Sequence, residues 1–134
     1  MRDIIMSVKA RHIRNMKLGL KKYELRHTST KDFKVANCYT RIWLCESGTA
    51  GRIVATFRCR TCPSMDHAQD TTIAKLCAIT AAEVQGYRQK GNGRLFGWMI
   101  EDFEDLKGTD RERHITDFGI TRPPQSWCYA KVED

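Results

Sequence analysis

Three ionisable residues, Lys21, Glu24 and Arg26, lie close together in the sequence and could form a binding or catalytic site. Lys21 and Arg26 can donate charge-assisted hydrogen bonds to a phosphate or to a base carbonyl. Glu24 can accept hydrogen bonds from an amino group, or it can hold the two cations in place. The ordinary alternative is an ion pair of Glu24 with Arg26 or Lys22 on one strand face, worth about 0 to 1 kcal/mol where exposed.

A second set, Cys59, Cys62, His67 and Cys77, could in principle complete a zinc tetrahedron, although its spacing is not a standard one. Cys59 shares strand parity with apolar residues, and Cys77 lies on the apolar side of a predicted helix. Buried free cysteines behave as small hydrophobic residues, so we expect no metal and no cofactor. Without a secretory signal, all six cysteines are expected to be free thiols in the cytoplasm.

The segment that contains Glu24 must be positioned by the elements before it. Apolar residues alternate over 4–8, which predicts a strand with one buried face. Residues 10–20 change to a helical period, with Met16 and Leu20 on the apolar side of a short basic helix. Residues 22–26 alternate again, so we expect a strand with one ionic and one apolar face.

The rest of the chain reads as irregularly interspersed strands and helices. Asp70 is a plausible N-cap for the longest helix, which Gly91 would end. Strands are predicted over 39–45, 52–60, 96–103 and 127–132, with the helix over 70–91. This order favours an α+β or β-barrel architecture over a doubly wound sheet.

The segment SVKARHIRNMKLGLKKYELR, from Ser7 to Arg26, resembles the opening of ASCH domains. It has a strand, a short helix and then a Gly-x-Lys-x-x-Glu-x-Arg signature, whose ionic residues are the three named first. The later order of elements, up to PPQSWCYAKV at 123–132, also looks like that family. The resemblance implies a single domain over 1–134, with a PUA-like mixed or antiparallel β-barrel of about six strands and two main helices. It also implies a cleft, lined by the signature residues, that is associated with RNA or modified nucleosides.

Composition and charge agree with a nucleic-acid partner. The 134 residues are 41% hydrophobic and 29% charged, as in folded globular proteins, and no apolar run is long enough to cross a membrane. The net charge is +7, but residues 1–60 hold 14 basic and 4 acidic residues, a net +10, whereas residues 61–134 hold 9 and 12, a net −3. A basic surface attracts phosphate backbones, although it could also be merely a solvated face.

These observations select candidate residues for binding RNA or single-stranded nucleic acid. Among the tryptophans, Trp43 and Trp98 are expected to be packed, while Trp127, after a Pro-Pro loop, could reach a cleft rim and stack on a base. No role is expected for the four histidines, because no paired spacing marks a metal site or a proton relay. The nucleic-acid-binding candidates are Arg11, Arg14, Lys21, Glu24, Arg26, Arg52, Arg58 and Trp127.

The leading hypothesis is a binding module for RNA, a nucleotide or a modified nucleoside. The second is a small hydrolase acting on RNA or a modified nucleoside, with Lys21 and Glu24 as its catalytic residues. Some ASCH relatives hydrolyse acetylated cytidine with a Lys and a Thr of the signature and a Glu elsewhere. Here Glu24 replaces that Thr, and Asp70 is the nearest counterpart of that Glu. A protein-interaction module is the third alternative.

Overall fold

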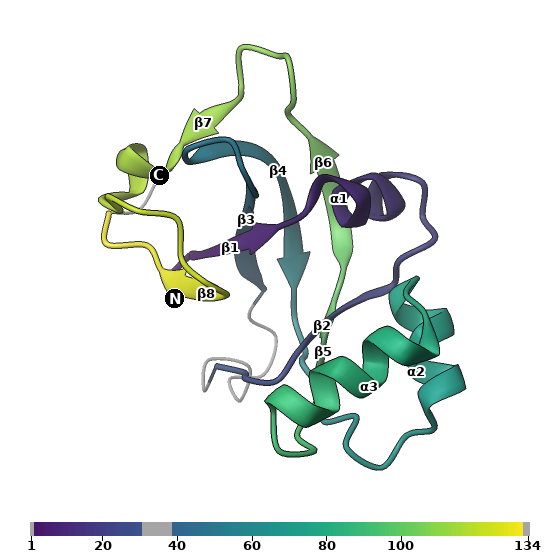
Figure 1. Cartoon of the computed structure of the whole chain (residues 1–134). Coiled ribbons are helices and arrows are strands. Elements are labelled where there is room, and N and C mark those ends of the chain that lie inside the picture. Colours follow the sequence, from purple (N-terminus) through teal and green to yellow (C-terminus); the bar gives the residue numbers. More distant parts are fainter. Residues whose placement is uncertain (1, 31–38, 133–134) are drawn as a thin grey trace.

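The computed structural model of the chain describes residues 2–30 and 39–132 and has an α+β fold, as expected (Figure 1). Its strands are β1 (Ile4–Val8), β2 (Tyr23–Arg26), β3 (Thr40–Glu46), β4 (Arg52–Cys59), β5 (Phe96–Met99), β6 (Glu101–Asp105), β7 (Arg113–His114) and β8 (Trp127–Tyr129). Its helices are α1 (Ala10–Lys17), α2 (Asp70–Cys77) and α3 (Ala81–Lys90), with a 3₁₀ helix at Ile115–Phe118.

The strands form two sheets that are not closed into the expected barrel. The six-stranded sheet has the order β6-β4-β3-β1-β8, with β7 also paired to β4, and β2 pairs with β5 in a separate two-stranded sheet. Strands β1 and β3 are parallel, and the other pairs are antiparallel. The hydrogen-bonded path therefore ends at β6 and β8, and β2 does not join those two edges.

The single strand predicted over 96–103 is wrong, because the chain changes sheets at Ile100. Strand β5 belongs to the small sheet and β6 to the large one. At the change, the amide of Ile100 donates to the carbonyl of Lys22, and Asp102 adopts a left-handed φ of 50°. The apolar positions change parity between Ile100 and Phe103, so the sequence did carry a sign of the break that the predicted single strand ignored.

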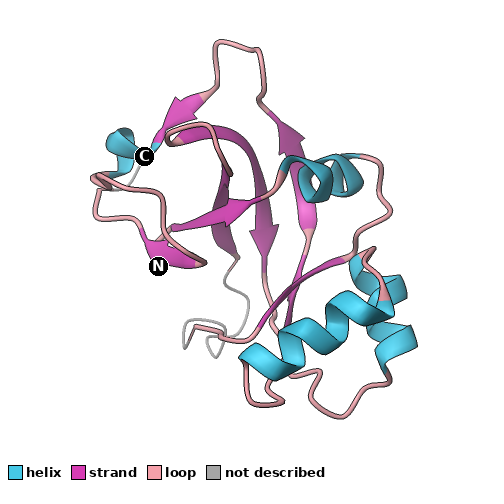
Figure 2. Cartoon of the chain, in the orientation of Figure 1, coloured by secondary structure: helices cyan, strands magenta, loops and turns pink. Residues whose placement is uncertain are grey.

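Both faces of the large sheet are covered by apolar side chains, which explains why its central strands have few polar residues. Ile4 and Ile42 pack on one face with Trp98, while Ile5 and Trp43 pack on the other, where Phe118 covers them. Trp43 and Trp98 are packed in the core, as predicted. A third cluster, which includes Leu25, Ile73, Val84 and Leu95, holds α2 and α3 beside the small sheet (Figure 2).

Helix α1 ends earlier than its sequence pattern predicted. Met16 is buried as expected, but Leu20 is 59% exposed, which corrects its assignment to the apolar face. The helix ends at Lys17, and Gly19 follows with a φ of +74°, a conformation that glycine adopts without steric cost. Leu20 lies beyond the end of the helix, so the helical period does not determine which way its side chain faces.

The long helix predicted over 70–91 is two helices, so the count of two main helices is corrected to three. Ala78 takes a left-handed φ of 52° after α2, and Thr80 then caps α3. Thr80 and Glu83 form a reciprocal capping box, in which each side chain accepts from the other residue's amide. Asp70 is the first residue of α2 and not its N-cap, which is Gln69.

Five cysteines are free thiols, as predicted, and Cys38 lies outside the described residues. Cys59 and Cys77 are fully buried in two different apolar clusters. Across residues 2–30 and 39–132, no three Cys, His, Asp or Glu side chains gather as metal ligands would. Within the same ranges, every helix is too short or too polar to cross a bilayer.

Candidate functional site

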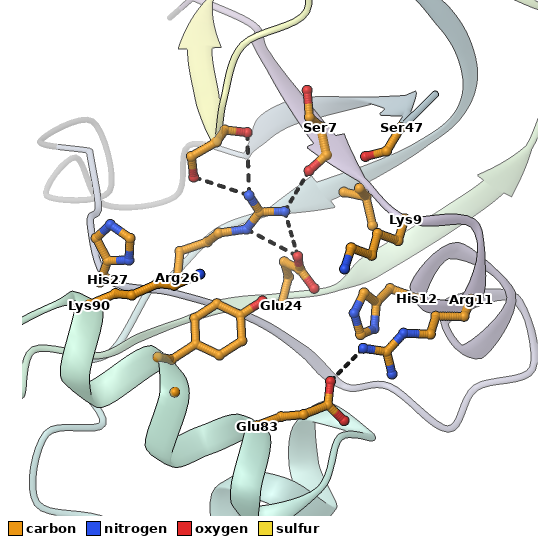
Figure 3. A pocket seen from close by; sticks show the side chains of 14 residues that line it. Ser7, Lys9, Arg11, His12, Glu24, Arg26, His27, Ser47, Glu83 and Lys90 are labelled. Atoms are coloured by element: carbon orange, nitrogen blue, oxygen red, sulfur yellow. Dashed lines mark hydrogen bonds and ion pairs between the residues drawn. The ribbon is translucent and has the colours of Figure 1, made fainter. Parts of the chain in front are cut away.

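A pocket of about 370 Å³ lies where β1 and α1 meet β2 and α3 (Figure 3). Its volume is within the range of small-molecule sites. One wall comes from the end of β1 and the start of α1, a second from β2 and a third from α3. These walls contribute Ser7, Val8, Lys9, Arg11 and His12; Glu24, Arg26 and His27; and Glu83, Gly86, Tyr87 and Lys90, with Ser47 and Ser126 at the edges.

Local backbone geometry explains why these side chains face one another. The two-residue period of β2 places Glu24 and Arg26 on the same strand face. On α3, Glu83, Tyr87 and Lys90 are spaced at i, i+4 and i+7, so they share one helix face. Three segments that are distant in sequence therefore supply one polar cavity.

The carboxylate of Glu24 is held between two cations. Its Oε1 is 3.1 Å from Lys21 Nζ, and its Oε2 accepts from Arg26 Nη2 at 2.6 Å and from Nε at 3.1 Å. The side chains of Lys21, Glu24 and Arg26 are only 1%, 3% and 11% exposed. The three signature residues thus meet at one carboxylate, and Glu24 and Arg26 line the pocket.

Arg26 also joins separate parts of the wall. Its Nη2 donates to the Ser7 carbonyl at 2.8 Å, and its Nη1 donates to Ser126 Oγ at 3.1 Å. These bonds link β2 to β1 and to the segment before β8, as the dashed lines in Figure 3 show. The guanidinium therefore has little freedom to move toward a ligand.

Lys21 lies behind this wall and is not among the pocket-lining residues. Its Nζ donates to the Cys77 carbonyl at 2.6 Å, in the last turn of α2. A cation is favourable there because the last carbonyls of a helix lack intrahelical partners. The geometry gives Lys21 two roles, neutralising Glu24 and closing the end of α2.

The surroundings set the protonation of two groups in the pocket. Burial alone would raise the pKa of Glu24, but the charges of Arg26 and Lys21 outweigh it and lower the pKa to about 2. Burial, followed by the charge of Lys21, lowers the pKa of His12 to about 4. At neutral pH the pocket therefore holds a carboxylate next to an uncharged imidazole.

The structure distributes the predicted nucleic-acid-binding residues over several surfaces. Arg11 lines the pocket and pairs with Glu83 at 2.5 Å, whereas Arg14 is exposed on α1 outside the lining. Arg52 pairs with Glu112 on another part of the surface. Arg58 lies on β4 in register with Glu101 of β6.

Trp127 and Asp70 also lie outside the pocket lining. The Trp127 ring packs edge-on against Trp98, with ring centroids 5.3 Å apart, and its Nε1 donates to Thr28 Oγ1 at 2.9 Å. The carboxylate of Asp70 accepts from Arg88 Nε at 2.8 Å. Neither side chain is therefore placed to contact a ligand in this pocket.

The separation of charge along the chain does not persist in space. Ion pairs join the basic first half to the acidic second half, since Lys17 contacts Asp105 and Arg60 contacts Glu101. Arg11 and Arg52 are paired across the halves in the same way. Within the pocket, neither Lys9 nor Lys90 has a carboxylate partner among the described residues.

Sequence reasoning missed the α3 wall and both histidines. Glu83, Tyr87 and Lys90 have a visible helical spacing, but they fell inside the single long helix predicted over 70–91 and were not connected with a site. His12 and His27 carry no spacing signal, because only the packing of α1 and β2 against α3 brings them to one cavity. The missed residues therefore depend on long-range packing.

Comparison with known proteins shows what this fold is similar to. By sequence, neither a protein-family model nor a curated protein matches the chain. By structure, a serine-to-alanine variant of an ASCH protein from Zymomonas mobilis matches with a TM-score of 0.71 at 12% identity, covering 96% of this chain and 87% of that one. A tyrosine-to-phenylalanine variant matches with a TM-score of 0.71 at 12% identity, covering 96% and 90%. A third ASCH structure from the same organism matches with a TM-score of 0.70 at 12% identity, covering 96% and 87%. The expected resemblance to ASCH domains is thus confirmed at the level of the fold.

Proposed function

We propose that this chain, which has the ASCH fold, binds a phosphorylated nucleoside in the pocket between β2 and α3, either free or as an unpaired nucleotide of RNA. The observation on which the proposal rests is the polarity of the pocket. A buried carboxylate, Glu24, lies in its wall, while Lys9 and Lys90 line it without carboxylate partners among residues 2–30 and 39–132. A ligand that matches this arrangement presents N–H donors to the carboxylate and an anionic group to a lysine.

A nucleotide has this distribution of groups. An ionised carboxylate only accepts hydrogen bonds, so Glu24 suits the amino or imino groups of a base. Lysine ammonium groups are common phosphate partners, and Tyr87 supplies an aromatic ring on which a base can stack. An inorganic phosphate alone fits less well, because Glu24 and Glu83 would repel it.

Binding is supported better than hydrolysis by the state of the signature residues. A general base works best with a pKa near the working pH, whereas the pKa of Glu24 is about 2. Lys21, the other catalytic candidate, directs its Nζ to the Cys77 carbonyl and to Glu24 behind the pocket wall. Neither residue is arranged to attack a substrate or to remove a proton from one.

The test is a titration of the unaltered chain with nucleoside monophosphates and with short single-stranded RNA, followed by fluorescence at several salt concentrations. We expect binding that weakens as salt rises, because phosphate contacts release counterions. Lys9→Ala with Lys90→Ala should lower RNA affinity and flatten the slope of log affinity against log salt by roughly 0.7 per lost phosphate contact. The matched control is Lys75→Ala with Lys131→Ala, which removes the same charge from exposed positions outside the pocket lining.

The outcomes separate the alternatives. Equal loss in the two double variants would mean that net charge, and not this pocket, attracts RNA. Cleavage of RNA or deacylation of a modified nucleoside by the unaltered chain would favour the hydrolase. Absence of both binding and turnover would contradict the proposal and favour a protein partner.

A further inference from the structure

His12 occupies an unusual position for a polar side chain. It lies in the first turn of α1, is only 6% exposed, and is followed by Ile13 on the buried side of the helix. Its ring nevertheless forms part of the pocket wall, near Glu24 and Arg11 (Figure 3). An apolar residue would satisfy the packing of this helix, so packing alone does not account for an imidazole here.

The ring also lacks a hydrogen bond that its burial would demand. His12 Nδ1 is enclosed and has no hydrogen-bond partner among the described residues. His27, at the opposite end of the pocket in Figure 3, has an enclosed Nδ1 in the same condition. A buried polar atom without a partner is destabilising, so native proteins retain few of them. The pocket wall therefore keeps an imidazole at a cost to stability, which a binding role for the ring's other nitrogen would explain.

The groups around His12 define what it can bind. Lys21 and Arg11 oppose a charge on the ring, while Glu24 and Glu83 favour one, and burial makes the uncharged form prevail at neutral pH. An uncharged imidazole donates one hydrogen bond and accepts one. Because Nδ1 is enclosed, Nε2 is the ring nitrogen left to bind a ligand in the pocket.

We propose that His12 is a binding residue of this pocket and that its Nε2 hydrogen-bonds an uncharged polar group of the nucleoside, on the base or on the sugar. The inference rests on the proposed function and adds a residue and an orientation to it. The phosphate lies toward Lys90, which Figure 3 shows on the side of the pocket away from His12, because Glu24 beside His12 would repel an anion. The nucleoside part therefore lies between His12 on the α1 wall and Glu24 on the β2 wall.

The test separates stability from affinity. His12→Phe keeps an aromatic ring of similar size and removes the unpartnered nitrogen, so the free protein should be at least as stable to urea as the unaltered chain. Its affinity for a nucleoside should fall by about three- to tenfold, the effect of one lost hydrogen bond. His12→Gln, which retains a donor and an acceptor, should recover part of that loss. His67→Phe, an exposed histidine outside the pocket lining, is the control.

Three ligands distinguish the role of His12 from the proposed function of the pocket as a whole. We expect His12→Phe to weaken a nucleoside and its monophosphate by the same factor, whereas Lys9→Ala with Lys90→Ala weakens only the monophosphate. Inorganic phosphate is the third probe, and its binding should not respond to His12→Phe. Unchanged nucleoside affinity in His12→Phe would overturn the role of His12 and leave the proposed function standing. If the unaltered chain binds neither nucleoside nor monophosphate, both proposals fail.

A second measurement does not depend on the stability of any variant. In the unaltered chain, ¹⁵N chemical shifts of the His12 ring report which nitrogen carries the proton and whether it is hydrogen-bonded. Saturating nucleoside should shift the Nε2 resonance, while the His67 ring stays unchanged. An unaffected Nε2 resonance in the presence of bound nucleoside would overturn the inference.

Discussion

The buried cluster Lys21–Glu24–Arg26 and the exposed pair Arg52–Glu112 contain the same chemistry in different surroundings. Glu24 is 2.6 Å from Arg26, and Glu112 is 2.5 Å from Arg52, so the two contacts are similar in length. The Arg26 side chain is 11% exposed, however, whereas that of Arg52 is 45% exposed. The difference between the two regions is the amount of water around the charges.

This difference in hydration determines how much each set of ion pairs contributes to stability. Exposed pairs contribute about 0 to 1 kcal/mol, because water already solvates both partners. In a buried cluster, removing one partner leaves the others charged and poorly solvated, which is destabilising by about 3 to 5 kcal/mol. Two members of this cluster, Glu24 and Arg26, lie in one wall of the pocket.

Of the variants that compare the two ion-pair regions, Glu24→Gln should lower the stability of the chain most. It leaves Lys21 and Arg26 buried beside a neutral amide, so we expect the free energy of unfolding to fall by about 3 to 5 kcal/mol. The measurement is urea unfolding followed by circular dichroism. Glu112→Gln is the matched control and should change stability by no more than about 1 kcal/mol. Similar losses in both variants would show that burial of the charge is not what distinguishes Glu24.

The pH dependence of stability should show two steps. The pKa of His12 is about 4 in the folded chain and near 6.5 when unfolded, so between these values the unfolded chain holds more protons. The pKa of Glu24 is about 2 when folded and near 4.5 when unfolded, with the same consequence at lower pH. Stability should therefore fall as pH falls from 6.5 to 4, through His12, and again from 4.5 to 2, where Glu24 titrates together with Glu83 and Glu112, whose pKa values are also lowered to about 2.

The upper step should be on the order of 3 kcal/mol, from the difference between the folded and unfolded pKa of His12. The measurement is urea unfolding at half-unit pH intervals in the unaltered chain and in His12→Phe. The upper step should disappear in His12→Phe, while the lower step remains. Persistence of the upper step in that variant would assign it to another group.

The sequence predicted the parts of this comparison that depend on local pattern. Alternating apolar residues located β1 and β4 closely, because one strand turns successive side chains to opposite faces. The same period placed Glu24 and Arg26 side by side. The signature then identified Lys21 as their neighbour, and the ASCH fold predicted from it was confirmed.

The rest of the site depends on contacts between distant segments. Glu24 is buried where β1, α1, β2 and α3 meet around the pocket, a packing that no local period reveals. Arg52 and Arg58 were expected to bind nucleic acid, but Glu112, just before β7, pairs with Arg52, and Glu101 of β6 lies in register with Arg58. Local sequence patterns also could not predict that the sheet stays open, because closure into a barrel depends on which edge strands meet.

Thr80→Ala tests an interaction that is intermediate in strength between the buried cluster and the exposed ion pair. Glu83 pairs with Arg11 at the pocket mouth and also completes the capping box of α3 with Thr80. Loss of the cap should lower the free energy of unfolding by about 1 kcal/mol, less than Glu24→Gln and more than an exposed pair. Thr72→Ala, at an exposed position inside α2, is the control for unfolding by urea. A loss of 3 kcal/mol or more would mean that the cap holds the pocket together as the buried cluster does.

The smallest effect is expected from a double-mutant cycle on Arg52 and Glu112. Glu112 also accepts from the Gly108 amide at 3.0 Å, so a single Glu112→Ala variant loses more than the ion pair. Combining Arg52→Ala, Glu112→Ala and the double variant cancels that loss and isolates the coupling between the two charges. We expect a coupling of about 0.2 to 1 kcal/mol that declines toward zero in 1 M salt, where screening acts over about 3 Å. A coupling above about 2 kcal/mol that persists in 1 M salt would contradict the comparison, because a pair with a 45% exposed arginine would then behave as a desolvated one. In that case, the different exposure of the two ion pairs to water would not explain why the pocket lies at the Glu24 cluster and not at the equally short Arg52–Glu112 pair.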